Sequence, residues 1–140
     1  MPNITVALDA MGGDFGPRVT VPAAVQALSH FPELKVILTG DQTAITTQLL
    51  SLGYQPDARL SIQHSDRVIS NSEKPSLALR NSNGTSMGMA IDAVAQGTAD
   101  ACVSSGNTGA LMALSRFRLK LLPGIERPAL ISALPTASGG

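Results

Sequence analysis

The stretch ACVSSGNTGALMAL, residues 101–114, contains the junction that decides the fold. Its apolar beginning predicts a strand over Ala101–Ser104, and its end predicts a helix over Thr108–Leu121. Between them stand Ser105 and the tetrapeptide Gly-Asn-Thr-Gly, which is more polar than a plain connection requires. A strand that passes directly into a helix is typical of α/β proteins, in which the two kinds of element alternate.

The rest of the sequence repeats this alternation. Short apolar runs predict strands at Ile4–Leu8, Leu34–Thr39, Leu60–Gln63, Ala101–Ser104 and Ala129–Leu134. Amphipathic runs predict helices at Val19–Leu28, Thr43–Leu52, Ser76–Arg80, within 85–97 and at Thr108–Leu121. Pro22 is expected in a first turn, where proline is tolerated. The pattern predicts an α/β fold of three layers, αβα, with a mostly parallel sheet, and the 140 residues show neither a repeat nor a linker.

The composition excludes several classes of function. Ten basic residues balance ten acidic ones and 3% of residues are aromatic, so neither a charge excess nor stacking platforms indicate nucleic-acid binding. The single Cys102 excludes an internal disulfide and a zinc site of several cysteines, and we expect it in a buried strand. We find no signal peptide and no apolar run long enough for a transmembrane helix, so we expect a soluble, cytoplasmic protein.

One edge of the predicted sheet collects glycine and polar residues. Right-handed crossovers bring the loops that follow parallel strands to the same edge, where ligands bind in open α/β folds. We therefore expect the functional site at this edge. The residues placed there are Asp9, Gly12, Gly13, Asp14, Gly40, Asp41, His64, Ser65, Ser104 through Gly109, and Thr136.

The turn Ser105–Gly109 has two interpretations. Asn107 or Ser105 can cap the following helix, and the turn is then only a well-capped junction. Alternatively, the free N–H groups at the helix start bind an anion with the help of the helix dipole. That site would use the N–H groups of Thr108, Gly109 and Ala110, with Gly106 and Gly109 letting the ligand approach. The sequence matches neither a P-loop nor the dinucleotide-binding fingerprint.

Two aspartates flank a glycine pair in LDAMGGDFGP, residues 8–17. Asp9 and Asp14 can bind a metal, act as bases, or order the loop through hydrogen bonds to backbone N–H groups. Loop ordering is the commoner role, and we expect no metal.

A polar connection, SEKPSLALRNSNGTSM at residues 72–87, carries positive charge and hydroxyl groups that can hold a phosphate or a substrate headgroup. The alternative is a solvated surface loop. The residues concerned are Lys74, Arg80, Ser82, Thr85 and Ser86.

Two further features have ordinary structural explanations. His30 and His64 have no partners at metal-ligand spacing, and we expect both to be structural. The stretch SRFRLKLLPG, residues 115–124, can form a basic amphipathic helix at a membrane surface. We favour a helix packed on the sheet or on a dimer partner, with its charges in solvent.

Four motifs give the chain a resemblance to a known family. ALDAMGGDFGP, KPSLALR, SSGNTGALMAL and LPGIERPAL, in this order, resemble the front portion of the bacterial phosphate acyltransferases of phospholipid synthesis. The resemblance covers essentially the whole chain, and the first and third motifs are long and specific. Family members are more than twice as long, so residues 1–140 are expected to be the N-terminal part of a single α/β catalytic domain, inactive alone.

The resemblance implies an activity. Family enzymes reversibly transfer a fatty acyl group from acyl carrier protein to inorganic phosphate, and a membrane acyltransferase uses the acyl-phosphate product. It implies no metal or organic cofactor and no nucleic-acid partner. It also implies a homodimer loosely associated with the membrane, and a fold similar to that of phosphotransacetylases and isocitrate dehydrogenases.

The residues that we expect to bind phosphate or substrate are chosen both from the resemblance and from their predicted position in the chain. No catalytic residue is assigned, because no G-x-S-x-G, S-x-x-K or His–Glu zinc pattern is present. A non-catalytic module that binds phosphoryl groups or nucleotides is the alternative, and half of an α/β dehydrogenase is a third possibility. The expected binding residues are Asp9, Gly12, Gly13, Asp14, Lys74, Arg80, Ser86, Ser105, Gly106, Asn107, Thr108 and Gly109.

Overall fold

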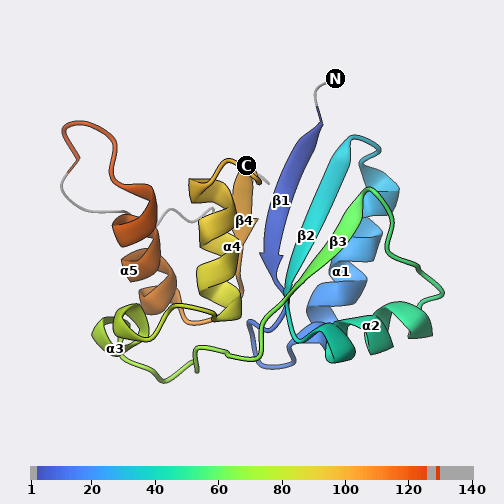
Figure 1. Ribbon diagram of the computed structural model, residues 1–140, viewed down its shortest axis with the longest axis horizontal. Helices are drawn as coiled ribbons and strands as arrows, with labels where there is room; N and C mark the ends of the chain where they lie inside the picture. Colours follow the sequence, from blue (N-terminus) through green and yellow to red (C-terminus); the bar gives the residue numbers. More distant parts are fainter. Residues whose placement is uncertain (1–2, 126–128, 130–140) are drawn as a thin grey trace, which may run out of the picture.

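The computed structural model describes residues 3–125 and residue 129. Strands and helices alternate along this part of the chain (Figure 1). The elements are β1 (Ile4–Asp9), α1 (Pro17–His30), β2 (Leu34–Gly40), α2 (Gln42–Ser51), β3 (Leu60–His64), α3 (Pro75–Arg80), α4 (Ser86–Ala95), β4 (Ala101–Val103) and α5 (Thr108–Leu119).

The four strands of the described residues form one sheet in the order β3-β2-β1-β4. Every neighbouring pair is parallel, and Val6 of β1 lies opposite both Val36 of β2 and Ala101 of β4. In β2 the last five residues are buried, as expected for a strand that has helices on both of its faces. The predicted α/β class with a parallel sheet is confirmed for this part of the chain.

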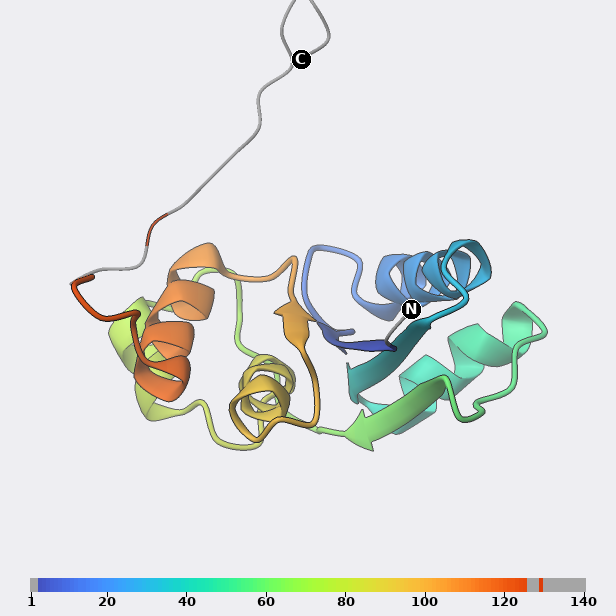
Figure 2. The same ribbon diagram turned by 90° about the horizontal axis from the view of Figure 1, so that it is seen from above.

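Helices cover both faces of the sheet. α1 packs on β1 and β2, and α2 packs on β3, whereas α4 packs on β1, β2 and β4 from the opposite side (Figure 2). α5 has its main contacts with α3 and α4. The direction of the chain across the sheet therefore reverses at β1, whose two neighbours are followed by helices on different faces.

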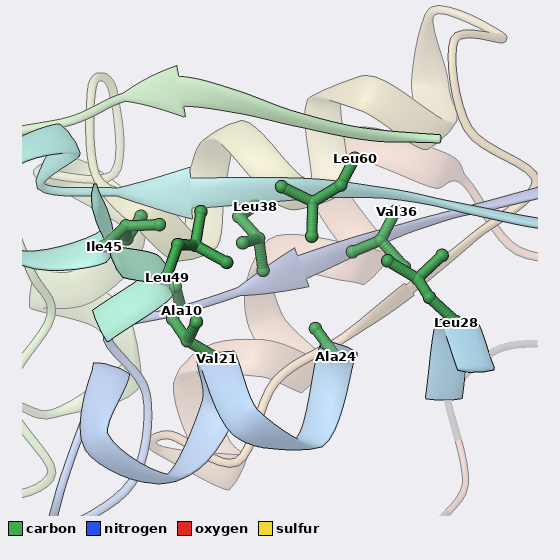
Figure 3. Packing of buried hydrophobic residues seen from close by; sticks show 9 residues of the cluster. All are labelled: Ala10, Val21, Ala24, Leu28, Val36, Leu38, Ile45, Leu49 and Leu60. Atoms are coloured by element: carbon green, nitrogen blue, oxygen red, sulfur yellow. The ribbon is translucent and has the colours of Figure 1, made fainter. Parts of the chain in front are cut away.

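A cluster of buried apolar side chains joins the sheet to α1 and α2. Burying each of its larger side chains stabilises the fold by roughly 1.5–3 kcal/mol. Figure 3 shows the cluster: Ala10, Val21, Ala24, Leu28, Val36, Leu38, Ile45, Leu49 and Leu60.

A second cluster holds α3, α4 and α5 together. Met87 and Ile91 of α4 and Leu114 of α5 are each at most 2% exposed, and Ala78 of α3 joins them. α4 begins close to the backbone before it, because a Cβ atom at Gly88 would lie 2.4 Å from the carbonyl oxygen of Ser82. Only glycine fits this contact, so any side chain at position 88 would push α4 away from the loop that precedes it.

Several helix ends differ from the sequence-based prediction by one or two residues, and two of these differences have a clear backbone cause. Pro22 lies in the second turn of α1, because the helix begins at Pro17, directly after Gly16 at φ +56°. Proline is favourable at a first helical position, and this moves the start of the helix two residues earlier than predicted. α5 ends at Leu119 rather than Leu121, since Lys120 has φ +63°. The predicted strand Ala129–Leu134 and Thr136 lie outside the described residues.

Candidate functional site

The carboxyl end of β1 lies between two diverging connections. The loop after β1 leads to α1 on one face of the sheet, and the loop after the neighbouring β4 leads to α5 in the layer of α4 (Figure 1). A crevice where the chain direction reverses is the usual ligand site of open α/β sheets. The site is therefore built from the ends of β1 and β4.

Asp9, the last residue of β1, orders both loops. Its side chain is 2% exposed. One carboxylate oxygen accepts a hydrogen bond from the backbone N–H of Met11 (3.1 Å), and the other accepts from Ser104 Oγ (2.9 Å). Ser104 Oγ in turn accepts from the N–H of Gly106 (3.1 Å). The interpretation of Asp9 as a loop-ordering residue is confirmed.

Two glycines allow the loops after β1 and β4 to touch. A Cβ atom at Gly12 would lie 2.9 Å from the backbone nitrogen of Gly106. Gly13 has φ +84°, and a Cβ atom there would lie 2.9 Å from Ser105 Oγ. Any side chain at position 12 would therefore separate the two loops.

Asn107 caps α5 and also ties it to a third loop. Its Oδ1 accepts from the N–H of Ala110 (3.1 Å), which selects Asn107 over Ser105 as the N-cap. Its Nδ2 donates to the carbonyl oxygens of Ser70 (3.0 Å) and Glu73 (2.7 Å). Both oxygens belong to the connection between β3 and α3, so one amide side chain joins two loops.

The cap changes which N–H groups are free at the start of α5. The N–H of Ala110, expected to face a ligand, is occupied by Asn107. Within the described residues, the N–H groups of Thr108 and Gly109 have no hydrogen-bond partner. They lie in the first turn, where the helix dipole favours an anion.

The connection between β3 and α3 brings a cation to this edge. Asn71 Nδ2 donates to Asp14 Oδ1 (3.2 Å), and a Cβ atom at Gly109 would lie 2.8 Å from Pro75 Cγ. Lys74 stands directly before Pro75, is exposed, and is the N-cap residue of α3. Its position in the chain therefore places it beside the start of α5.

Arg80 lies at the far end of α3, whereas Ser86 is buried at the start of α4, beside Thr39, the residue of β2 that pairs with Asp9. Arg80 is the exposed last residue of α3, at the opposite end from Lys74. Ser86 is 0% exposed, and its carbonyl oxygen accepts from Thr39 Oγ1 (2.8 Å). Thr85 caps α4, because its Oγ1 accepts from the N–H of Gly88 and donates to the carbonyl of Ser82, whereas the buried Oγ of Ser86 has no hydrogen-bond partner within the described residues.

The two histidines have structural partners, as predicted. His64 Nδ1 accepts from the N–H of Gln42 at the start of α2 (3.1 Å), and His30 Nδ1 lies 2.9 Å from the carbonyl oxygen of Gln26. Residues 3–125 contain no cluster of three or more His, Cys, Asp or Glu side chains placed to hold a metal. The expectation that Cys102 lies in a buried strand is wrong for the described residues: Cys102 is half-buried, and Ala101 and Val103 beside it in β4 are exposed, since β4 lies at one side of the described sheet. Burial still raises the pKa of the Cys102 thiol.

The charges of α5 are not all in solvent. Arg118 forms an ion pair with Asp92 of α4 through Nη1. Its Nη2 donates to Ser82 Oγ and to Asn83 Oδ1. This corrects the expectation that the charged side chains of this helix face solvent, because Arg118 fastens α5 to α4 and to the loop before it.

No helix in the described part of the chain is long and apolar enough to cross a membrane.

The sequence alone does not indicate three contributors to the site. They are the hydroxyl of Ser104, which the sequence only places at a strand end, the side chain of Asn71 and the carbonyl of Ser70. Each acts through a partner far along the chain: Ser104 and Asp9 are 95 residues apart, and Asn71 and Asp14 are 57 apart. A single sequence carries no signal for such pairs.

Comparison with known proteins assigns the chain to a family. The sequence profile of the family described as "Fatty acid synthesis protein" matches residues 4–140. The "Phosphate acyltransferase" of Vibrio vulnificus (strain YJ016) is 83% identical over 140 residues. The "Phosphate acyltransferase" of Vibrio cholerae (strain M66-2) is 84% identical over 139 residues. These matches include 100% and 99% of this chain, which spans 41% of the length of each relative.

Proposed function

Since this chain belongs to the fatty acid synthesis protein family, we propose that it forms the N-terminal part of a single α/β catalytic domain of a phosphate acyltransferase. The enzyme transfers a fatty acyl group from acyl carrier protein to inorganic phosphate, reversibly, without a metal or organic cofactor. The observation that supports this most is the contact between the Gly12–Gly13 loop and the Ser104–Gly109 turn at the reversal point of the sheet. A site of this kind can bind phosphate through hydrogen-bond donors that the two touching loops hold in fixed positions.

Phosphate is bound at the start of α5. The N–H groups of Thr108 and Gly109 and the dipole of α5 supply neutral donors. Lys74 supplies the positive charge from the neighbouring loop. Asp9 and Ser104 do not touch the phosphate; they hold the turn in the shape that presents these donors.

The reaction is a direct acyl transfer. A phosphate oxygen attacks the thioester carbonyl carbon and forms a C–O bond, and the carbonyl electrons move to an oxyanion that backbone N–H groups stabilise. When the oxyanion collapses, the C–S bond breaks. The carrier thiolate leaves with the electron pair and takes a proton from water, and acyl-phosphate remains. Holding phosphate and thioester together supplies much of the rate.

The wider setting follows from the same proposal. The acyl-phosphate product is passed to a membrane acyltransferase, and the enzyme acts as a homodimer in the cytoplasm, loosely associated with the membrane. The sheet continues as in the phosphotransacetylase and isocitrate dehydrogenase-like fold.

Release of free thiol tests the proposed activity. The intact enzyme, meaning this chain at the full length of its relatives, is mixed with acyl-acyl carrier protein with and without inorganic phosphate. We expect thiol release that depends on phosphate. Release that ignores phosphate would indicate a thioesterase instead.

Replacing Asn107 tests the turn. Asn107→Ala removes both the cap of α5 and the tether to the Ser70 and Glu73 carbonyls. Losing such a cap costs about 1 kcal/mol, and the N–H groups of Thr108 and Gly109 lose their fixed direction. We expect kcat/KM for phosphate to fall at least about tenfold, which corresponds to about 1.4 kcal/mol. Thr43→Ala, an exposed residue at the start of α2, is the control. Unchanged kinetics in Asn107→Ala would remove the turn from the site.

The non-catalytic binding module is the second candidate, and one observation favours it. Most groups proposed for phosphate binding are backbone N–H groups, which bind an anion without taking part in a reaction. Tight nucleotide binding by the intact protein, with no consumption of thioester, would select this alternative.

A further inference from the structure

Helices α3 and α5 enclose a groove between them. Its lining residues are Leu79 of α3 and Ala113, Arg116 and Phe117 of α5, and its volume is about 490 Å³. Phe117 is 72% exposed, and Leu77 of α3 is 44% exposed. The groove therefore combines an apolar lining with a cation in its wall.

The surface around the groove is positively charged although the whole chain is neutral. Residues 74–91 and 101–125 contain no acidic residue, and they carry five of the ten basic residues of the chain. Arg118 is paired with Asp92. The remaining four are exposed and form no ion pair within the residues that the structure describes; they are Lys74, Arg80, Arg116 and Lys120.

We propose that this α3–α5 groove is the docking surface for the acyl carrier protein. The partner it fits is a protein that presents a helix with acidic side chains and one or two projecting apolar ones. Charge complementarity argues for this partner, because an acidic helix would meet Arg80 and Arg116 while an apolar side chain enters beside Phe117. The proposal rests on the proposed function, which supplies the carrier.

The groove lies within reach of the proposed phosphate site. α5 begins with Thr108 at the site, and Ala113 and Phe117 stand five and nine residues further along the same helix. At 1.5 Å per residue this places the groove roughly 8–14 Å from the turn. A thioester on a flexible arm can extend from a carrier docked there to the phosphate.

The same residues do not form a surface suited to a membrane. An interfacial helix buries a long apolar face in the lipid. The main apolar positions of α5, Ala110 and Leu114, are already buried against α3 and α4. Of the exposed apolar residues left on the two helices, Leu77, Phe117 and Leu119, only Phe117 lines the groove, where it stands beside Arg116. A projecting side chain from a protein partner fits a hollow better.

Two substrates that differ only in the carrier test the proposal. The intact enzyme is assayed with acyl-acyl carrier protein and with the same acyl group on pantetheine, which has no protein to dock. In Arg116→Glu we expect KM for the carrier substrate to rise about tenfold and its salt dependence to weaken, because a docking cation has been reversed. Kinetics with acyl-pantetheine should not change. Phe117→Ala should raise the same KM several-fold without a change of charge.

Lys35→Glu is the matched control, since Lys35 is the second residue of β2, at the amino end of that strand and so away from the site edge, and the charge change is identical. An unchanged KM for the carrier substrate in both Arg116→Glu and Phe117→Ala overturns the docking surface while leaving the proposed function intact. Loss of binding to phosphatidylglycerol vesicles in Arg116→Glu, without a change of KM, assigns the groove to lipid and also overturns it. A wild-type enzyme without phosphate-dependent thiol release overturns the proposed function itself.

Discussion

Ser104 determines the local geometry of the site although its side chain carries no charge. Its hydroxyl donates to the buried carboxylate of Asp9 and accepts from the N–H of Gly106. A serine at this position therefore satisfies one acceptor and one donor that would otherwise be left without partners. Unpaired buried polar groups cost about 1–3 kcal/mol each, so this residue contributes to stability as well as to the shape of the turn.

A double-mutant cycle measures this connection. We expect Ser104→Ala to lower the free energy of unfolding by about 1–3 kcal/mol, because Gly106 N–H and one oxygen of Asp9 lose their partner. In the double variant with Asp9→Asn, we expect the loss of unfolding free energy to be smaller than the sum of the two single losses by at least about 1 kcal/mol. Urea unfolding of the chain supplies the values. Ser51→Ala, an exposed serine bonded within its own helix, should change stability by less than about 0.5 kcal/mol. Strict additivity of the two site substitutions would contradict a direct connection.

At this scale the sequence predicts local chemistry well and distant partners poorly. The loop-ordering role of Asp9 and the capping role of Asn107 were predictable, because both act on backbone groups within three residues. The burial of Ser86 was not, because hydroxyls before a helix look alike whether they face a ligand or the sheet. Only the packing of α4 against the strands distinguishes these two cases.

Arg118 ties α5 to the neighbouring helix and loop of its layer. The guanidinium joins Asp92 on α4 to Ser82 and Asn83 in the loop before α4, so three segments share one side chain. Arginine suits this task because its planar group offers several donors in fixed directions. The short α3 is held by apolar packing, because Ala78 and Leu79 contact the cluster that joins α3, α4 and α5.

Hydrogen exchange tests the role of Arg118. In Arg118→Met the aliphatic stem is kept and the charged contacts to α4 are lost. We expect the amides of α5 to exchange about tenfold faster or more, while those of β1 and β2 remain protected. Arg116→Met removes an exposed arginine from the same helix and should leave exchange unchanged. Equal exchange rates in the two variants would show that apolar packing alone fixes the helix.

The elements themselves follow closely from the sequence. Apolar β-branched runs predicted β1 and β2, and Gly53 and Gly97, both at positive φ, follow α2 and α4 as expected stops. The errors lie at helix ends, where one residue decides: Gly16 lets α1 begin at Pro17, and Lys120 ends α5 early. Hydrophobic periodicity carries no information about such backbone angles.

At the scale of the whole molecule, the relevant feature is β4, which lies at one side of the described sheet. β4 pairs with β1, and Val103 is 51% exposed. On the α1 face, an apolar hollow of about 280 Å³ is lined by Val6, Leu8, Val103 and neighbouring residues of α1 and β2. Sheet edges and apolar hollows of this kind promote association between copies.

A charge on this edge tests that expectation. Val103→Lys places an ammonium beside the hollow, and lysine is a common protection of sheet edges. We expect the Val103→Lys variant to associate less than the original chain at each protein concentration, as measured by light scattering and sedimentation. Its far-ultraviolet circular dichroism should be unchanged. Val68→Lys, an equally exposed valine in the loop after β3, is the control. If both variants associate like the original chain, the β4 edge does not drive association.

The strand order also determines when the site can exist. β1 is made first, but its second neighbour, β4, and the hydroxyl that completes the Asp9 contact come 95 residues later. Closing so long a loop costs entropy that only the finished sheet recovers. On the ribosome, β1 and β2 can pair early, whereas the Gly12–Gly106 contact must wait until residue 106 has left the exit tunnel. Phosphate binding would therefore report the last step of folding in this part of the chain, and a ligand present during synthesis would find nothing to bind before that step.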